Sequence, residues 1–145
     1  MNDKTYISWN DFHQDVKNLC QKIKQTNIQY DKIVAISRGG FIPAGIIAYE
    51  LDIRNSAVVN ISTYINNKQT KLEKINNIET IGKIDEKTLI IDDLSDSGQT
   101  IKIMRETFKN GTYVTVYAKE KGKSYPDIYE KDMPNHWLVF PWDIE

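Results

Sequence analysis

The chain has 145 residues, the size of one domain, and at that length about 70% of the unfolded surface can be buried without a disulfide or a structural metal. Its 19 basic and 20 acidic side chains leave a net charge of −1, which argues against nucleic acid or a membrane as partner. Cys20 is the only cysteine, the N-terminus lacks a signal-peptide core, and no apolar run approaches the ~20 residues of a membrane span. We therefore expect a cytoplasmic protein without intrachain disulfides.

The first half of the chain alternates between helical and extended patterns. Ser8 is placed to cap a helix that continues through Ile23, because apolar residues recur there at helical spacing. Residues 33–36 are a short apolar run, typical of a buried strand. A helix over 43–51 follows, with proline in its first turn, and residues 58–61 form the second predicted strand.

The second half continues this alternation after a polar interruption. The stretch 66–87 opens with a run of polar residues, so we predict a mobile loop there. Residues 89–91 are the third predicted strand. A helix over 100–108 follows and is stopped by the Asn-Gly pair at 110–111, and residues 113–117 form the fourth strand.

Alternation of short apolar strands with helices predicts an α/β fold, with a mostly parallel central sheet flanked by helices on both faces. We treat residues 1–145 as a single domain. Ligands of such sheets bind beyond the carboxyl ends of the strands. Two of the predicted strands end in polar loops, at 37–40 and 92–100, so we expect the functional site there.

The segment 89–100, with the sequence LIIDDLSDSGQT, carries the most specific chemical signal. A buried strand delivers Asp92 and Asp93 to the sheet edge, where adjacent carboxylates repel unless cations or hydroxyl donors, such as hydrated Mg²⁺ and a ribose diol, satisfy them. Residues 96–100 then open a helix, whose first N–H groups and dipole suit a phosphate monoester. A plain helix cap would account for one aspartate but not for three.

This segment resembles the PRPP-binding motif of type I phosphoribosyltransferases, in which a hydrophobic strand precedes two acidic residues, two variable positions and Asp-Thr-Gly-x-Thr (PRPP is phosphoribosyl pyrophosphate). Ser97 replaces the usual threonine and keeps the hydroxyl. The resemblance implies PRPP contacts from Asp92, Asp93, Asp96, Ser97, Gly98, Gln99 and Thr100. It also implies Mg²⁺ as cofactor with Asp93 and Asp92 as metal ligands, and Asp96 as the catalytic group that accepts or orients the N7 proton of the base.

The turn Ser37-Arg38-Gly39-Gly40 is weak evidence when taken alone. Beside the first motif it resembles the pyrophosphate loop of the same family, in which backbone amides and the Arg38 guanidinium would bind pyrophosphate. The resemblance therefore adds Ser37, Arg38, Gly39 and Gly40 to the PRPP contacts, with Arg38 as a second catalytic residue. The string 34–45 is similar to the bacterial xanthine–guanine and hypoxanthine branch, which implies a homodimer or homotetramer.

Base recognition is implied by the C-terminal part of the resemblance. Lys119 ends the fourth predicted strand and aligns with a lysine that donates to the O6 atom of a purine. Trp137 and Leu138 lie in a segment that resembles the hood of that branch, where Trp137 would stack on the base and Leu138 would offer backbone groups. We assign Trp142 to core packing. The expected core is then about 1–118 and the hood about 119–145.

These features predict Mg-dependent transfer of the 5-phosphoribosyl group from PRPP to a 6-oxopurine (guanine, xanthine or hypoxanthine), in purine salvage. The products are the nucleoside 5′-monophosphate and pyrophosphate. Thr63-Tyr64 resembles the Ser-Tyr pair that opens the catalytic lid of the family. One alternative is transfer to another base, against which Lys119 and Trp137 argue. The other is a non-catalytic PRPP or nucleotide sensor of the same fold, against which the net charge of −1 argues.

Overall fold

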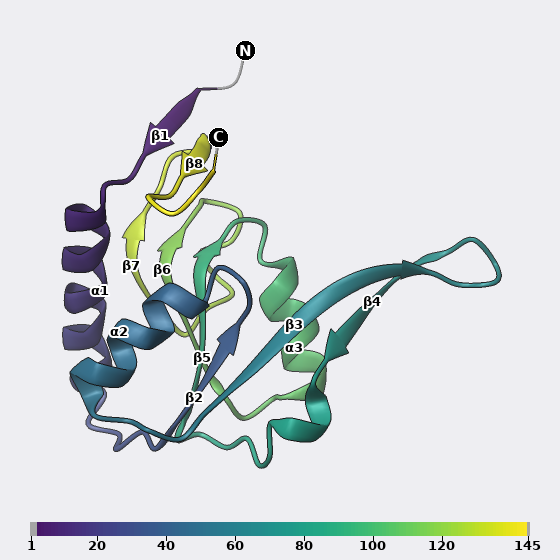
Figure 1. Cartoon of the computed structure of the whole chain (residues 1–145), viewed down its shortest axis with the longest axis horizontal. Coiled ribbons are helices and arrows are strands. Elements are labelled where there is room, and N and C mark those ends of the chain that lie inside the picture. The colour runs from purple at the N-terminus through teal and green to yellow at the C-terminus, as the bar shows by residue number, and fades with distance from the viewer. Residues whose placement is uncertain (1–2, 145) are drawn as a thin grey trace.

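The computed structural model describes residues 3–144 and, at Thr63 and Tyr64, the backbone alone. Strands and helices alternate along most of the chain (Figure 1). The strands are β1 (Lys4–Tyr6), β2 (Lys32–Ile36), β3 (Ser56–Ile65), β4 (Lys71–Asn76), β5 (Thr88–Ser95), β6 (Thr112–Ala118), β7 (Ile128–Asp132) and β8 (Trp137–Val139). The helices are α1 (Trp9–Lys24), α2 (Phe41–Leu51) and α3 (Gln99–Thr107), with a short 3₁₀ turn η1 (Ile78–Thr80).

Six strands form the central sheet, in the order β4-β3-β2-β5-β6-β7. All neighbours run parallel except β3 and β4, which confirms the predicted α/β fold with its mostly parallel sheet. Side chains of β2 alternate between two buried clusters: Ile33 and Ala35 pack with α1 and α2, whereas Val34 and Ile36 pack with α3. Because both faces are covered, the strand reads as one continuous apolar run in the sequence.

Helix α1 begins and is buried as the sequence predicts. Ser8 is its N-cap, and the Ser8 hydroxyl oxygen accepts a hydrogen bond from the Asp11 N–H at 3.0 Å. The apolar stripe of α1 is fully buried and consists of Phe12, Val16, Leu19, Cys20 and Ile23. No helix within the described range 3–144 is both long and apolar enough to cross a lipid bilayer.

The prediction of a loop over 66–87 was wrong for part of that stretch. Strand β3 continues to Ile65, and β4 pairs antiparallel with it in a ribbon that projects from the sheet (Figure 1). Asn66 builds the turn, since its side-chain oxygen accepts from the N–H groups of Lys68 and Thr70 at 2.9 and 3.0 Å. The ribbon is polar because most of its side chains face solvent, and that polarity concealed the strand. Thr63 and Tyr64, the expected lid residues, lie in β3, but their side chains fall outside the described residues.

Strands from both ends of the chain complete the fold. β7 joins the central sheet beside β6, although its residues lie in the range expected for the hood. β1 pairs with β8 in a separate two-stranded parallel sheet, in which Lys4 lies opposite Trp137. The hood is therefore braced by the N-terminus, and the expected boundary between core and hood near residue 118 stays a prediction.

Candidate active site

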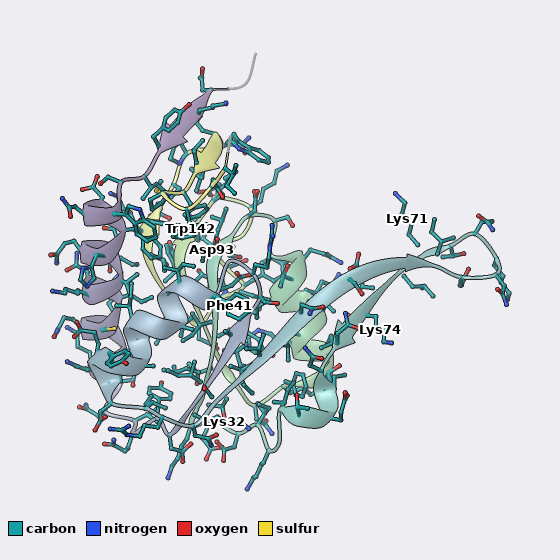
Figure 2. The ribbon with its side chains drawn as sticks, viewed as in Figure 1. Lys32, Phe41, Lys71, Lys74, Asp93 and Trp142 are labelled. Carbon is teal, nitrogen blue, oxygen red and sulfur yellow. The ribbon has the colours of Figure 1, made fainter. Side chains whose placement is uncertain are left out.

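Three polar segments meet at one edge of the central sheet. Residues 37–40 follow β2, residues 96–98 follow β5, and Lys119 follows β6. These three strands are neighbours and run parallel, so their carboxyl ends lie side by side. Figure 2 shows Asp93 near this edge and Lys32, at the start of β2, at the opposite end of the sheet.

The loop after β2 packs directly on Asp93 of β5. A β-carbon added at Gly39 would lie 2.5 Å from Oδ2 of Asp93, so only glycine lets this backbone approach the carboxylate so closely. Arg38 is exposed and lines the same pocket as Asp93. The peptide bond between Ser37 and Arg38 is cis. The turn places backbone amides and one guanidinium beside the Asp93 carboxylate.

Asp92 and Asp93 are held in a low-dielectric position. Burial raises the pKa of Asp92 well above its usual range, and the charge of Asp93 raises it further. Burial also raises the pKa of Asp93, an effect opposed by hydrogen bonds from its surroundings and reinforced by the charge of Asp143. The Asp92 side chain accepts from the Asp93 N–H at 2.9 Å. Both carboxyl groups therefore gain stability from a proton, a cation or a hydroxyl donor.

The loop between β5 and α3 forms a cavity of about 80 Å³. All the residues predicted to hold a phosphate, 96–100, line it. Gly98 is the N-cap of α3 and has a φ of 87°, a left-handed conformation that favours glycine. It offers no side-chain acceptor, so N–H groups of the first turn of α3 remain available to an anion. Ser97 Oγ accepts from the Gln99 N–H at 3.3 Å, which places a hydroxyl beside the same turn. The cavity has the size and donors for one phosphate group.

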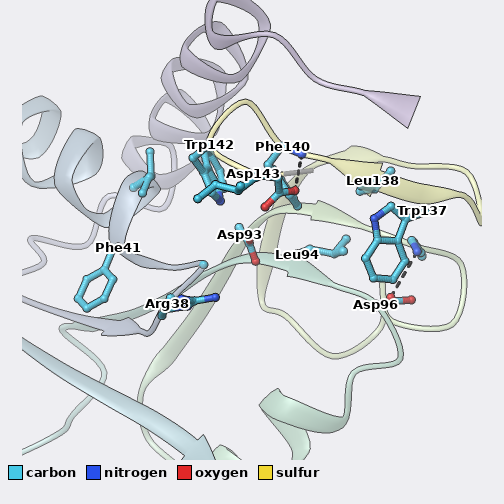
Figure 3. A pocket seen from close by; sticks show the side chains of 14 residues that line it. Arg38, Phe41, Asp93, Leu94, Asp96, Trp137, Leu138, Phe140, Trp142 and Asp143 are labelled. Atoms are coloured by element: carbon cyan, nitrogen blue, oxygen red, sulfur yellow. Dashed lines mark hydrogen bonds and ion pairs between the residues drawn. The ribbon is translucent and has the colours of Figure 1, made fainter. Parts of the chain in front are cut away.

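A larger cavity, of about 620 Å³, is lined by Asp93 of the acidic pair, and its size suits a small-molecule ligand. Figure 3 shows Arg38 and Phe41 at one end and Trp137 and Asp96 at the other. Asp93 lies between these two ends. Lys119 and Leu138 also line the cavity, so the residues predicted to bind the base and those predicted to bind pyrophosphate share one pocket.

Lys119 is buried at the end of β6 and forms an ion pair with Asp96, from Nζ to Oδ2 at 3.3 Å. The Asp96 side chain is mostly exposed to the pocket. The main chain at Lys119 is fixed as well, because its N–H donates to the Ser95 carbonyl oxygen at 3.0 Å. A buried ammonium requires acceptors, so this group presents a charged donor to whatever occupies the pocket.

Two tryptophans of the C-terminal segment have different surroundings. Trp137 is 67% exposed and presents its ring to the pocket without packing into the core. Trp142 is half-buried and stacks on Phe140, with ring centroids 4.7 Å apart, and it also meets Phe12 edge to face at 4.8 Å. The core packing that we expected for Trp142 is present. Trp137 is free to stack on a planar ligand.

Asp143 lines the pocket and was not among the predicted site residues. Its carboxylate accepts from the Phe140 N–H at 2.8 Å, and its charge raises the pKa of Asp93 (Figure 3). Asp93 and Asp143 lie far apart in the sequence, so no local pattern predicts that their charges interact. The only sequence signal was the aromatic turn at 140–142, which returns the chain toward the sheet edge.

Comparisons with known proteins agree with this geometry. The model of the phosphoribosyl transferase domain family matches residues 4–145. The chain is 37% identical over 140 residues to a xanthine-guanine phosphoribosyltransferase of Nitratidesulfovibrio vulgaris, an alignment that covers 96% of this chain and 84% of that protein. It is 38% identical over 139 residues to the enzyme of the same name from Chromohalobacter salexigens, with 95% and 83% covered. The crystal structure of a purine phosphoribosyltransferase from Pyrococcus horikoshii Ot3 superposes with a TM-score of 0.82 at 26% identity, covering 98% of this chain and 95% of that one.

Replacing Asp92 with asparagine should stabilise the unliganded protein at neutral pH. The folded Asp92 carboxyl has a raised pKa and therefore binds its proton more tightly than the unfolded one. The stability that the Asp92 proton contributes to the wild type is consequently lost as the pH rises from about 4, the pKa of aspartate in the unfolded chain, through the pKa of Asp92 in the folded protein. Asparagine cannot titrate, so the advantage of Asp92→Asn should grow over this range.

Urea unfolding of both proteins from about pH 4, near the reference pKa of aspartate, to about pH 8 would measure this difference. Asp31→Asn is the matched control, because Asp31 is exposed and precedes β2 at the opposite end of the sheet. A stability difference between Asp92→Asn and wild type that stays constant with pH would contradict the burial argument.

Proposed function

The chain belongs to the phosphoribosyl transferase domain family, and from that premise we propose that it transfers the 5-phosphoribosyl group of PRPP to a 6-oxopurine base. The products are the nucleoside 5′-monophosphate and pyrophosphate, and the reaction serves purine salvage. The observation that carries this proposal is the pocket that the buried Lys119, the exposed Trp137 and Asp93 line together. A cationic donor beside an aromatic face is suited to an oxopurine ring.

The order of the subsites supports one orientation of PRPP. We assign its 5′-phosphate to the small cavity at 96–100 and its ribose diol to Asp92 and Asp93. Its pyrophosphate then meets residues 37–40, where Arg38 and the backbone amides provide donors. In this orientation the anomeric carbon faces the larger cavity, in which the base is held.

Mg²⁺ fits this arrangement, since Asp92 and Asp93 are half-buried carboxyl groups with raised pKa values that a cation would stabilise. Within residues 3–144 no group of three acidic, histidine or cysteine side chains is arranged to hold a metal ion. The remaining ligands would therefore come from oxygens of PRPP. When bound, Mg²⁺ supplies charge neutralisation for the departing pyrophosphate.

The chemical step requires one bond to form and one to break. N9 of the base attacks the anomeric carbon, and the bond from that carbon to the pyrophosphate oxygen breaks, with its electrons leaving on pyrophosphate. Arg38 stabilises this negative charge. The proton on N7 passes to Asp96 or is oriented by it, which neutralises the attached base. Lys119, already paired with Asp96, donates to O6 of the base, and Trp137 stacks on its ring.

The direct test is pyrophosphate release when the protein is mixed with PRPP, Mg²⁺ and each of several bases. We expect release with guanine, xanthine or hypoxanthine, and none with excess EDTA. Release with orotate in preference to every purine would overturn the base assignment. PRPP binding without release for any base would favour a non-catalytic sensor. The expected homo-oligomer and the cytoplasmic location stay predictions.

Replacing Asp96 with asparagine should lower kcat by about 10²-fold or more, as for loss of a general acid–base group. Asparagine keeps the shape of the side chain but removes the negative charge that lies 3.3 Å from the Lys119 ammonium. The affinity for PRPP, measured by calorimetry, should change little. Glu120→Gln is the control, because this exposed carboxylate pairs with Lys123 outside the pocket. A near-normal kcat for Asp96→Asn would remove Asp96 from the mechanism.

Lys119 and Trp137 should contribute to base binding in separable ways. Lys119→Ala should weaken the preference for 6-oxopurines over adenine, because a buried ammonium rejects a base that cannot accept from it. Trp137→Ala should raise KM for all purines by a similar factor, equivalent to about 1–3 kcal/mol of stacking. The measurement is kcat/KM for guanine, hypoxanthine, xanthine and adenine, with the exposed Lys121→Ala as control. Equal use of adenine and hypoxanthine by the wild type would contradict this assignment.

A further inference from the structure

Tyr125 lies directly behind the phosphate-binding loop, outside the residues assigned to any subsite. A β-carbon added at Gly98 would overlap the Tyr125 ring, so the ring packs against the backbone at the N-cap of α3. The small cavity is lined by residues between Asp92 and Ile101, and Tyr125 is not among them. Any influence of Tyr125 on a bound phosphate must therefore act through Gly98.

Tyr125 is itself fixed from the far end of α3. Arg105, in the last turn of that helix, donates from Nη2 to the Tyr125 carbonyl oxygen at 2.9 Å. The same guanidinium pairs with Asp127 at 3.1 Å and lies 4.4 Å above the ring of Tyr113. Asp127 in turn accepts from the Tyr113 N–H at 2.7 Å. The segment is thus held by α3 and β6 together.

The residues before Tyr125 extend this support to the other side of the loop. Ser95 Oγ donates to the Gly122 carbonyl oxygen at 2.8 Å, and the Tyr125 N–H donates to the same oxygen at 3.2 Å. The backbone of Gly122 is in close contact with Ser95 and Asp96, where a β-carbon would not fit. The chain from Lys119 to Tyr125 therefore forms a rigid support behind residues 95–98.

We propose that Tyr125 is a positioning residue for the 5′-phosphate of PRPP, an inference that rests on the proposed function. Its ring fixes Gly98, and Gly98 sets the direction of the first N–H groups of α3. Loss of the ring frees Gly98, which has no side chain of its own to restrain it. Because binding of a phosphate depends on how accurately these donors are aimed, the effect should fall on phosphate affinity more than on the chemical step.

The test compares Tyr125→Ala with Tyr125→Phe. In the described part of the chain no hydrogen bond uses the Tyr125 hydroxyl, so phenylalanine keeps every contact that the inference requires. Ribose 5-phosphate probes the phosphate subsite without turnover, by calorimetry. We expect its Kd to rise about 10-fold, or 1.4 kcal/mol, for Tyr125→Ala, and to stay near the wild-type value for Tyr125→Phe. KM for PRPP should rise in step for Tyr125→Ala, with kcat and KM for the base nearly unchanged.

Three results would overturn the inference: unchanged ribose 5-phosphate affinity in Tyr125→Ala, an equal loss in Tyr125→Phe, or a parallel fall in kcat and base affinity. Tyr49→Ala is the matched control, since this ring is 92% exposed on α2. If circular dichroism shows that Tyr125→Ala does not fold, Tyr125→Leu replaces it with the same expectation, because leucine keeps apolar volume but not the flat ring.

The proposed function can fail separately from this inference. A wild-type protein that releases no pyrophosphate from PRPP with any purine would remove the proposed function. Ribose 5-phosphate affinity would still report on the phosphate loop, and its loss in Tyr125→Ala alone would still support the role of the ring. A wild-type protein that releases pyrophosphate but does not bind ribose 5-phosphate would overturn the inference and leave the proposed function in place.

Discussion

Two adjacent carboxyl groups within the strand β5 impose the main constraint on this molecule. Asp92 and Asp93 are carried into a low-dielectric position by β5, and burial raises the pKa of each. Glycine is required opposite them, since a β-carbon at Gly39 would collide with Asp93. The rest of the fold holds this unfavourable arrangement in place. The two apolar clusters on either face of the sheet supply the stability that offsets it.

The donors of the site are placed around these carboxyl groups by backbone and not by long side chains. The Ser37 N–H donates to the Val59 carbonyl oxygen of β3 at 2.8 Å, and the Lys119 N–H donates to the Ser95 carbonyl oxygen of β5 at 3.0 Å. In the large cavity, Arg38 and Lys119 provide charged donors and Trp137 presents its exposed ring. Recognition of phosphate therefore depends on the sheet and helix framework, whereas recognition of the base depends on a few side chains.

The sequence predicted the parts of the molecule that follow from local pattern. The capped helix α1, the strand β2 and the motif at 89–100 were all recognisable from spacing and turn chemistry. Strand β4 was missed because its apolar residues, Leu72 and Ile75, do not alternate with polar ones at a period of two, and β1 and β8 because each is three residues long. The position of Asp143 near Asp93 and the packing of Tyr125 on Gly98 were also missed. Both depend on tertiary contacts that no local pattern encodes.

The pairing of β1 with β8 has a consequence for the order in which the protein folds. Thr5 bonds to His136 across 131 positions of the chain, at 2.8 Å. During synthesis, β1 emerges from the ribosome first but has no partner until β8 has also emerged. The central strands and α3 emerge earlier, so the phosphate-binding loop at 96–100 can form before β8, which carries Trp137, has emerged. Closure of a loop this long is slow, and the nascent chain exposes the apolar side of α1 near Phe12 in the meantime.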